Sequence, residues 1–321
     1  MLRCQSGWET HPIGGWKVRV LRVSDGAHSS SVRFVPSMGC NIIGWEVDGV
    51  EYLVASEPDG RILGTPILYP MPNRVRDGVF SFDGREFRFT PNNGPNFIHG
   101  LVRDTPWELD EPEITAEGIS LAARIAMAPG TTLHGLFPIR NTLTLRLEVS
   151  PGRLGMAFTV QNDDAEHRLP FGLAIHPYFA IHGSREDVTL HIPAKRCMEA
   201  ESLLPTGRLL PPGARSADPT QPVSLAGLDL DDVFWGMRAE EPATITYQTL
   251  GKRITLQADD WFTHAVVYTP PQAPYFCVEN QSCSTDAHNL YARGLSEAAH
   301  LTILDPGQTH HASIVFRLDD V

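Results

Sequence analysis

The chain has 321 residues, of which 20% are charged and 42% are hydrophobic, and its formal net charge is −12 at pH 7. An acidic surface argues against nucleic acid or an anionic membrane as a partner, although a few arginines can still dominate one pocket. Five cysteines without a Cys-x-x-Cys spacing, no signal peptide and no apolar run of membrane-spanning length predict a cytoplasmic protein with reduced thiols.

Two β-hairpins are predicted in the first hundred residues, because apolar residues alternate on both sides of an Asp-Gly pair. The first hairpin covers 45–52 and turns at Asp48-Gly49, and the second covers 79–89 and turns at Asp83-Gly84. Asp-Gly is a favoured two-residue hairpin turn. The alternation predicts one apolar face on each hairpin, made of Trp45, Val47, Val50 and Tyr52 in the first and Phe80, Phe82, Phe87 and Phe89 in the second.

Strand signals continue to the C-terminus, whereas helical periodicity is scarce. Residues 142–149 alternate strictly, and the next strand continues the pattern at Met156, Phe158 and Val160. Six later strands are expected at 188–192, 243–247, 254–256, 265–268, 301–304 and 312–318.

One short helix is expected after Thr285, which would be its N-cap, and it would end near Gly294. The segment from Pro205 to Pro222 is expected to be a long loop, and no composition break marks a linker. We therefore predict one domain over residues 1–321, with an all-β fold that forms a large antiparallel β-sandwich.

Two apolar, strand-like segments each carry one ionisable side chain. Residues 170–179 carry His176 with Tyr178 nearby, and residues 274–281 carry Glu279 near Phe276. The pKa of a group on a buried strand is set by its neighbours, which is how enzymes prepare acid and base partners. Either residue alone is more simply explained as a hydrogen-bonded core residue, but the two together favour an acid–base site.

Other polar residues stand in stiff or turn-rich segments, where loops present ligands. Asn73 and Arg74 follow two prolines, His99 ends the loop 92–100, and a group of acids at 229–232 precedes Phe234. Each also has an ordinary explanation, as a solvated arginine, a turn histidine or an exposed acidic loop.

Motifs for cofactors and metals are missing from the sequence. There is no glycine-rich phosphate loop, no Gly-x-Ser-x-Gly elbow and no His-Glu-x-x-His helix. Of the thirteen histidines only His310 and His311 are adjacent. We therefore expect no cofactor and no catalytic metal.

Taken in order, these segments resemble the aldose 1-epimerase (mutarotase) family and its sugar-phosphate epimerase relatives. The matches cover about residues 40–290, and they are Asn73-Arg74, Asn93-Gly94 with His99-Gly100, His176-Pro-Tyr-Phe179, Asp231-Asp-Val-Phe234 and Glu279. The resemblance implies a galactose mutarotase-like β-supersandwich that binds a monosaccharide on the concave face of a curved sheet.

The resemblance also implies roles for these residues. Glu279 would be the general base that takes the anomeric proton, and His176 the general acid that protonates the ring oxygen, about a pyranose ring apart and without a cofactor. The substrate would be bound by Asn73, Arg74, His99, Tyr178, Asp231 and Arg103, with Asp232 as the alternative to Asp231.

Departures from the galactose-preferring branch leave the sugar open. Pro177 follows His176, Asn280 stands between Glu279 and Gln281, and the pattern from His99 to Arg103 is closer to hexose-6-phosphate epimerases. We expect a free aldose as substrate and a monomer or homodimer.

Three alternatives remain. A hexose 6-phosphate could be bound by Arg74, Arg76 and Arg103, unless Arg103 instead pairs with Asp104 or Glu108. A carbohydrate-binding protein without catalysis is the second alternative, and metal-dependent hydrolysis is the least favoured.

Overall fold

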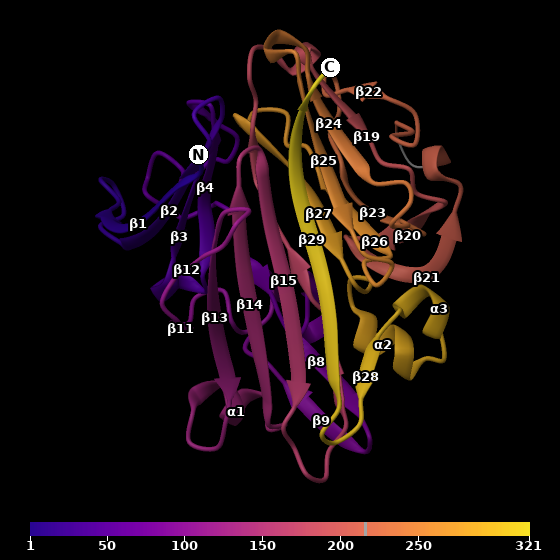
Figure 1. Ribbon diagram of the computed structural model, residues 1–321. Coiled ribbons are helices and arrows are strands. Elements are labelled where there is room, and N and C mark those ends of the chain that lie inside the picture. Colours follow the sequence, from indigo (N-terminus) through magenta and orange to yellow (C-terminus); the bar gives the residue numbers. More distant parts are fainter. Residues whose placement is uncertain (215–216) are drawn as a thin grey trace.

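Strands dominate the computed structural model, which describes residues 1–214 and 217–321 (Figure 1). The three largest sheets have ten, eight and five strands. The strand pairings within them are antiparallel. The predicted all-β antiparallel architecture is therefore confirmed.

The 10-stranded sheet contains the longest strands and forms the front layer in Figure 1. Its strands are, in spatial order, β11 (Glu108–Leu109), β13 (Ile119–Met127), β14 (Asn141–Ser150), β15 (Arg153–Asn162), β29 (Thr309–Asp320), β25 (Lys252–Ala258), β24 (Ala243–Tyr247), β19 (Val188–His191) and β22 (Val223–Ser224), with β12 (Glu113–Ile114) also paired to β13.

The 8-stranded sheet lies behind this layer and carries both segments that were predicted to form an acid–base site (Figure 1). Its strands are, in spatial order, β21 (Leu204–Leu210), β20 (Arg196–Glu201), β23 (Asp231–Trp235), β26 (His264–Tyr268), β27 (Tyr275–Gln281), β17 (Ala174–Ile175) and β6 (Ile67–Leu68), with β18 (Tyr178–Ala180) also paired to β27.

The remaining elements are a 5-stranded N-terminal sheet, three two-stranded sheets and three short α-helices. The 5-stranded sheet consists of β1 (Arg3–Thr10), β2 (Lys17–Ser24), β3 (Ser29–Val35), β4 (Asn41–Val47) and β5 (Val50–Glu51). The two-stranded pairs are β7 (Arg74–Val75) with β10 (Phe97–Ile98), β8 (Val79–Phe82) with β9 (Arg85–Arg88), and β16 (Leu169–Phe171) with β28 (Thr302–Leu304). The helices are α1 (Thr132–Leu136), α2 (Ala287–Ala292) and α3 (Ser296–Ala299).

Aromatic side chains join the two large sheets. The ring of Phe179 in β18 lies 5.8 Å from that of Phe276 in β27 and 5.6 Å from that of Phe316 in β29. Every residue of β27 is buried, so both faces of this strand are covered. Because side chains alternate along a strand, Phe276 and Val278 enter the core while Glu279 points to the opposite face.

The predicted hairpins are confirmed. Val47 pairs with Val50 across the first turn, and Phe80 pairs with Phe87 across the second. The predicted apolar faces are buried, except that Val50 is only partly covered. The six later strands are confirmed as β19, β24, β25, β26, β28 and β29.

Two local predictions are wrong. The N-cap of α2 is Asp286 and not Thr285, because the amide of Asp286 donates to the carbonyl of Arg74 (2.8 Å) and its left-handed backbone (φ 56°) starts the turn. The predicted loop at 205–222 instead contributes most of β21, which pairs with β20 through contacts that its proline-rich sequence does not reveal. Residues 215–216 of that segment lie outside the described residues.

Four of the five cysteines are buried. Residues 1–214 and 217–321 contain the helices α1, α2 and α3. None of these is long and apolar enough to span a bilayer.

Candidate active site

The candidate site lies on the face of the 8-stranded sheet that points away from the core. Ala174 of β17 pairs with Gln281, and Tyr178 of β18 pairs with Cys277. His176 lies midway between these two positions, so the strand period of two places it opposite Glu279 on the same face. The structure confirms the contact, because Nε2 of His176 lies 3.2 Å from Oε1 of Glu279.

Both members of this pair are removed from water, with His176 6% exposed and Glu279 2% exposed. Burial lowers the pKa of His176 to about 4, and the positive charges of Arg103 and Arg74 act in the same direction. Burial also raises the pKa of Glu279 well above its usual value, and Asp231 adds to this effect. Each shift favours the neutral form of its own group, which is imidazole for His176 and carboxylic acid for Glu279.

This distance corrects one expectation from the sequence. The acid and the base were expected about a pyranose ring apart, whereas their side chains are in hydrogen-bonding contact. The contact suits the chemistry, because the anomeric oxygen and the ring oxygen of an aldose are bonded to the same carbon. Two adjacent protein groups can therefore face the two oxygens that exchange protons.

A third side chain, Gln281, completes the hydrogen bonding of Glu279. Its Nε2 donates to Oε2 of Glu279 over 3.0 Å, and Gln281 is fully buried. The sequence reasoning did not assign it to the site. The period of two along β27 would have found it, because residues 279 and 281 share one face.

Arg74 is held by several polar groups of the site. Its Nε donates to Oδ1 of Asn93 and its Nη1 to Oδ1 of Asn73, both over 3.1 Å. Its Nη2 lies 3.6 Å from Oδ2 of Asp231. Residues that are far apart in the sequence are therefore brought together around one guanidinium.

Asp231, and not Asp232, lies on the site face of β23. Asp231 pairs with Tyr268, which pairs with Cys277, so it shares a face with Glu279. Asp232 is buried on the opposite face of this strand. Burial raises the pKa of the Asp231 carboxyl, while Arg74 opposes this shift.

Two aromatic side chains surround His176. The ring of Tyr178 stacks on it with centroids 4.6 Å apart, and the ring of His99 meets it edge-on at 5.2 Å. His99 is held in a left-handed conformation (φ 71°), and its amide donates to the carbonyl of Asn73. The Nδ1 atom of His99 is buried and makes no hydrogen bond within the described part of the chain.

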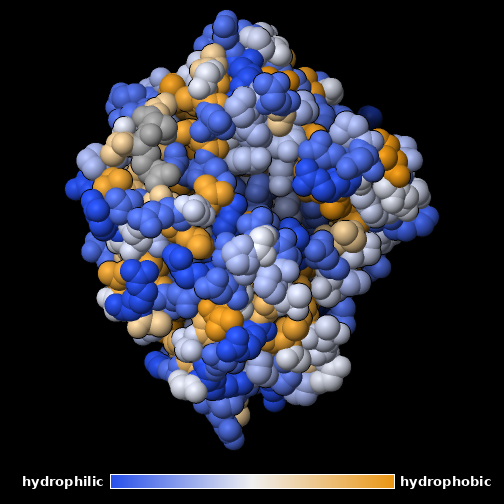
Figure 2. Space-filling model, turned by 180° about the vertical axis from the view of Figure 1, so that it is seen from behind, coloured by the Kyte–Doolittle hydropathy of each residue, from blue (hydrophilic) through white to orange (hydrophobic). Residues whose placement is uncertain are grey.

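A cavity of about 190 Å³ opens beside these rings. It is lined by residues of the sheet face and of the preceding loops: Asn41, Arg61, Ile62, Leu63, Pro66, His99, Arg103, Asp104, His176 and Tyr178. In Figure 2, the face opposite the 10-stranded sheet shows a mainly hydrophilic hollow near its middle. Polar side chains with a few apolar walls suit a sugar, which has hydroxyl groups around an apolar ring.

The arginines at and near the site do not converge. Nε of Arg103 lies 3.1 Å from Oδ2 of Asp104, which confirms the expected pairing with a nearby acid. Arg76 does not share a face with Arg74, because the strand ends at Val75 and Nε of Arg76 lies 3.6 Å from Oδ2 of Asp286.

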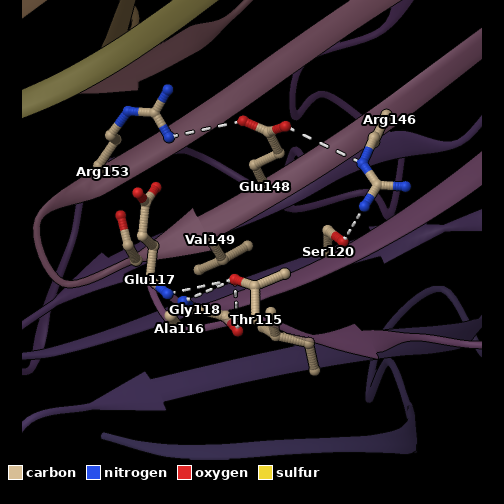
Figure 3. A pocket seen from close by; sticks show the side chains of 11 residues that line it. Thr115, Ala116, Glu117, Gly118, Ser120, Arg146, Glu148, Val149 and Arg153 are labelled. Atoms are coloured by element: carbon tan, nitrogen blue, oxygen red, sulfur yellow. Dashed lines mark hydrogen bonds and ion pairs between the residues drawn. The ribbon is translucent and has the colours of Figure 1, made fainter.

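A second pocket, of about 290 Å³, lies between the turns β12–β13 and β14–β15 (Figure 3). Its charged groups already pair with one another: Glu148 lies 3.9 Å from Arg146 and 3.7 Å from Arg153, and Arg146 also donates to Ser120. The pocket contains no histidine, and of the acids that line it Glu117 is exposed and Glu148 is half-buried. It therefore lacks the acid–base pair found in the cavity beside His176.

A metal centre is not formed by the side chains described. Across residues 1–214 and 217–321, no three His, Cys, Asp or Glu side chains are grouped so that they could hold a metal ion. His310 and His311 lie on β29, where His311 bonds to Thr159.

Sequence comparisons connect the chain with known proteins. The sequence profile of aldose 1-epimerases matches residues 20–317. Galactose mutarotase of Sus scrofa is 29% identical over 181 residues, which are 54% of this chain and only 49% of that protein. Galactose mutarotase of Homo sapiens is 27% identical over 61% of this chain and 59% of that protein. The uncharacterized protein YihR of Escherichia coli K12 is 22% identical over 86% of each chain.

Solved structures share the fold. A galactose mutarotase-like protein from Clostridium acetobutylicum superimposes with a TM-score of 0.87 and 18% identity, over 100% of this chain and 99% of that one. Galactose 1-epimerase from Lactobacillus acidophilus superimposes with a TM-score of 0.77 and 15% identity, again over 100% and 99%. At these identities the similarity establishes the architecture, which is the galactose mutarotase-like sandwich expected from the sequence.

Proposed function

This chain belongs to the aldose 1-epimerase family, and we propose that it interconverts the α and β anomers of a free aldose by acid–base opening of the sugar ring. One observation carries the proposal: the buried contact between His176 and Glu279 beside a polar cavity. A site that only binds sugar has no need of a shared proton, so this contact counts against a non-catalytic carbohydrate-binding protein.

The proposed reaction moves two protons and leaves the pair ready for the reverse step. Glu279, as a carboxylate, takes the proton of the anomeric hydroxyl while the C1–O5 bond breaks and the C1–O1 double bond forms. His176, as an imidazolium, gives its proton to the ring oxygen. After rotation about the C1–C2 bond, the reverse transfers close the ring on the other face of C1.

The proton count of the pair is the same before and after ring opening. Burial favours imidazole and carboxylic acid, and transfer of one proton across the 3.2 Å contact converts them to the reacting imidazolium and carboxylate. Ring opening returns the pair to imidazole and carboxylic acid, with one proton shared in each case. No cofactor is required for these transfers.

The neighbouring polar groups would orient the sugar. Arg74 and His99 would bind ring and exocyclic oxygens, Asn73 would support Arg74, and Asp231 would accept a hydrogen bond from a hydroxyl. Tyr178 would present an apolar ring face next to His176.

We favour a free aldose over a hexose 6-phosphate because the arginines that would bind phosphate already have acidic partners. Of the two that line the cavity, Arg61 pairs with Glu57 and Arg103 with Asp104, while Arg76 lies beside Asp286. A doubly charged phosphate would need guanidinium groups that are free and directed at one point. The single-domain organisation, the cytoplasmic location and the monomeric or homodimeric state remain predictions.

Polarimetry on freshly dissolved α-glucose and α-galactose tests the proposed function. The purified protein is expected to speed the decay of optical rotation over buffer, with the same rate when EDTA is present. If it accelerates the mutarotation of no common aldose or aldose phosphate, the proposed function is wrong.

A further inference from the structure

We propose that Gln281 is a positioning residue that holds the Glu279 carboxyl group with Oε1 toward His176 and stabilises its carboxylate form. This inference deepens the proposed function and rests on it. The two oxygens of Glu279 have different partners: Oε1 faces His176 at 3.2 Å, and Oε2 accepts from Nε2 of Gln281 at 3.0 Å. One oxygen is thereby assigned to the acid–base pair, and the other fixes the rotation of the carboxyl group.

The backbone gives this arrangement its rigidity. Gln281 is paired with Ala174 on one side and with His264 on the other, so the end of β27 is held between two strands. Its side chain is fully buried and cannot move into solvent. A group that acts from a paired strand is held more precisely than one on a loop.

Packing alone does not explain an amide at this position. Oε1 of Gln281 is buried and makes no hydrogen bond to the residues described, which costs stability. Leucine or methionine would fill the same space without an unpaired oxygen. An ionised carboxylate only accepts hydrogen bonds, so the amide is oriented with its NH₂ group toward Glu279 when that group is charged.

Other charged and titratable groups surround Glu279. Burial and Asp231 raise its pKa, whereas Gln281 and Arg74 lower it. The groups that face the carboxyl from the surrounding elements are His176, Cys277, Tyr178, Asp231 and Arg74. Of Gln281 and Arg74, Gln281 is the one that donates a hydrogen bond to the carboxyl group.

The first test removes the donor and keeps the size of the side chain, with Gln281→Met. We expect kcat for the preferred aldose to fall about 10–100-fold, because a hydrogen bond to a charged acceptor is lost. KM should change little, since Gln281 does not face the cavity. The limb of the pH–rate profile that reports Glu279 should move to higher pH. Gln257→Met, which deletes a partly buried amide contact in the other large sheet, is the matched control.

Gln281→Glu supplies a rescue that a purely structural role would not show. At neutral and high pH it places a second carboxylate next to Glu279, so the loss of kcat should exceed that of Gln281→Met. As the pH falls, the new side chain becomes protonated and can donate the missing hydrogen bond. Its rate relative to wild type should therefore rise toward low pH, and a ratio that stays constant with pH would overturn the proposal.

A carbon-13 titration of the Glu279 carboxyl group, assigned by its loss in Glu279→Gln, separates this inference from the proposed function. We expect the titration in Gln281→Met to move to higher pH than in wild type. If it moves while no aldose is turned over, the positioning role holds and the proposed function fails. If it stays unchanged in a folded Gln281→Met protein, the positioning role is refuted.

Discussion

Replacement of Glu279 by glutamine isolates the general base, because the two side chains have nearly the same shape. The loss of a positioned acid or base lowers a rate by about 10²–10⁴-fold. This corresponds to about 3–5 kcal/mol of lost transition-state stabilisation. We expect a decrease of this size in kcat for mutarotation by Glu279→Gln.

The structure indicates that the fold should tolerate this change. The new amide can keep its oxygen toward His176 and place its NH₂ group toward Gln281. Two NH₂ groups would then meet, but a flip of the Gln281 amide presents its unpaired Oε1 as an acceptor. Removal of a buried carboxyl group also removes the cost of ionising it, so the melting temperature should change by only a few degrees.

Polarimetry for the rate and circular dichroism for the melting temperature test this prediction together. Glu148→Gln is the matched control, because Glu148 lies on the outer face of the 10-stranded sheet (Figure 3) and its pairs with arginine are exposed. If Glu279→Gln folds and keeps more than about a third of the wild-type rate, the assignment of the base is wrong.

Two further predictions concern selectivity and pH. Arg103→Ala should change kcat/KM less than about fivefold for glucose and for glucose 6-phosphate, because its ion pair with Asp104 is exposed. A phosphate preference above about tenfold that this substitution abolishes would contradict the choice of a free sugar. The free energy of unfolding should fall as the pH drops from 6.5 toward 4. Burial lowers the pKa of His176, and that of His288 in α2, to about 4 in the folded protein, and both bind protons more readily when unfolded. In urea denaturation at pH 7 and 4.5, His288→Asn should remove about 2 kcal/mol of this dependence, and an unchanged dependence would show that His288 is not responsible.

Local patterns in the sequence were enough to predict many of the strands, although none was predicted at β1–β3, β13 or β20. Alternation of apolar residues and Asp-Gly turns placed both hairpins, and strict alternation placed β14 and β15. This information is local, because the period of two and the turn geometry act within a few residues. The same reasoning missed β21 and misplaced the N-cap of α2, where pairing with β20 and a backbone contact to Arg74 decide the structure.

The sequence by itself also determined which residue types were candidates for acid–base chemistry, since His176 and Glu279 stand on apolar, strand-like segments. Only the tertiary structure decided that their side chains touch, that Gln281 bonds to Glu279, and that Arg74 meets Asp231 and not Asp232. The contacts of His176 with Glu279 and of Arg74 with Asp231 join segments that are far apart in the chain. Their geometry depends on which strands become neighbours in the 8-stranded sheet and on the register of their pairing. Burial of the whole core determines both, and no local sequence pattern does.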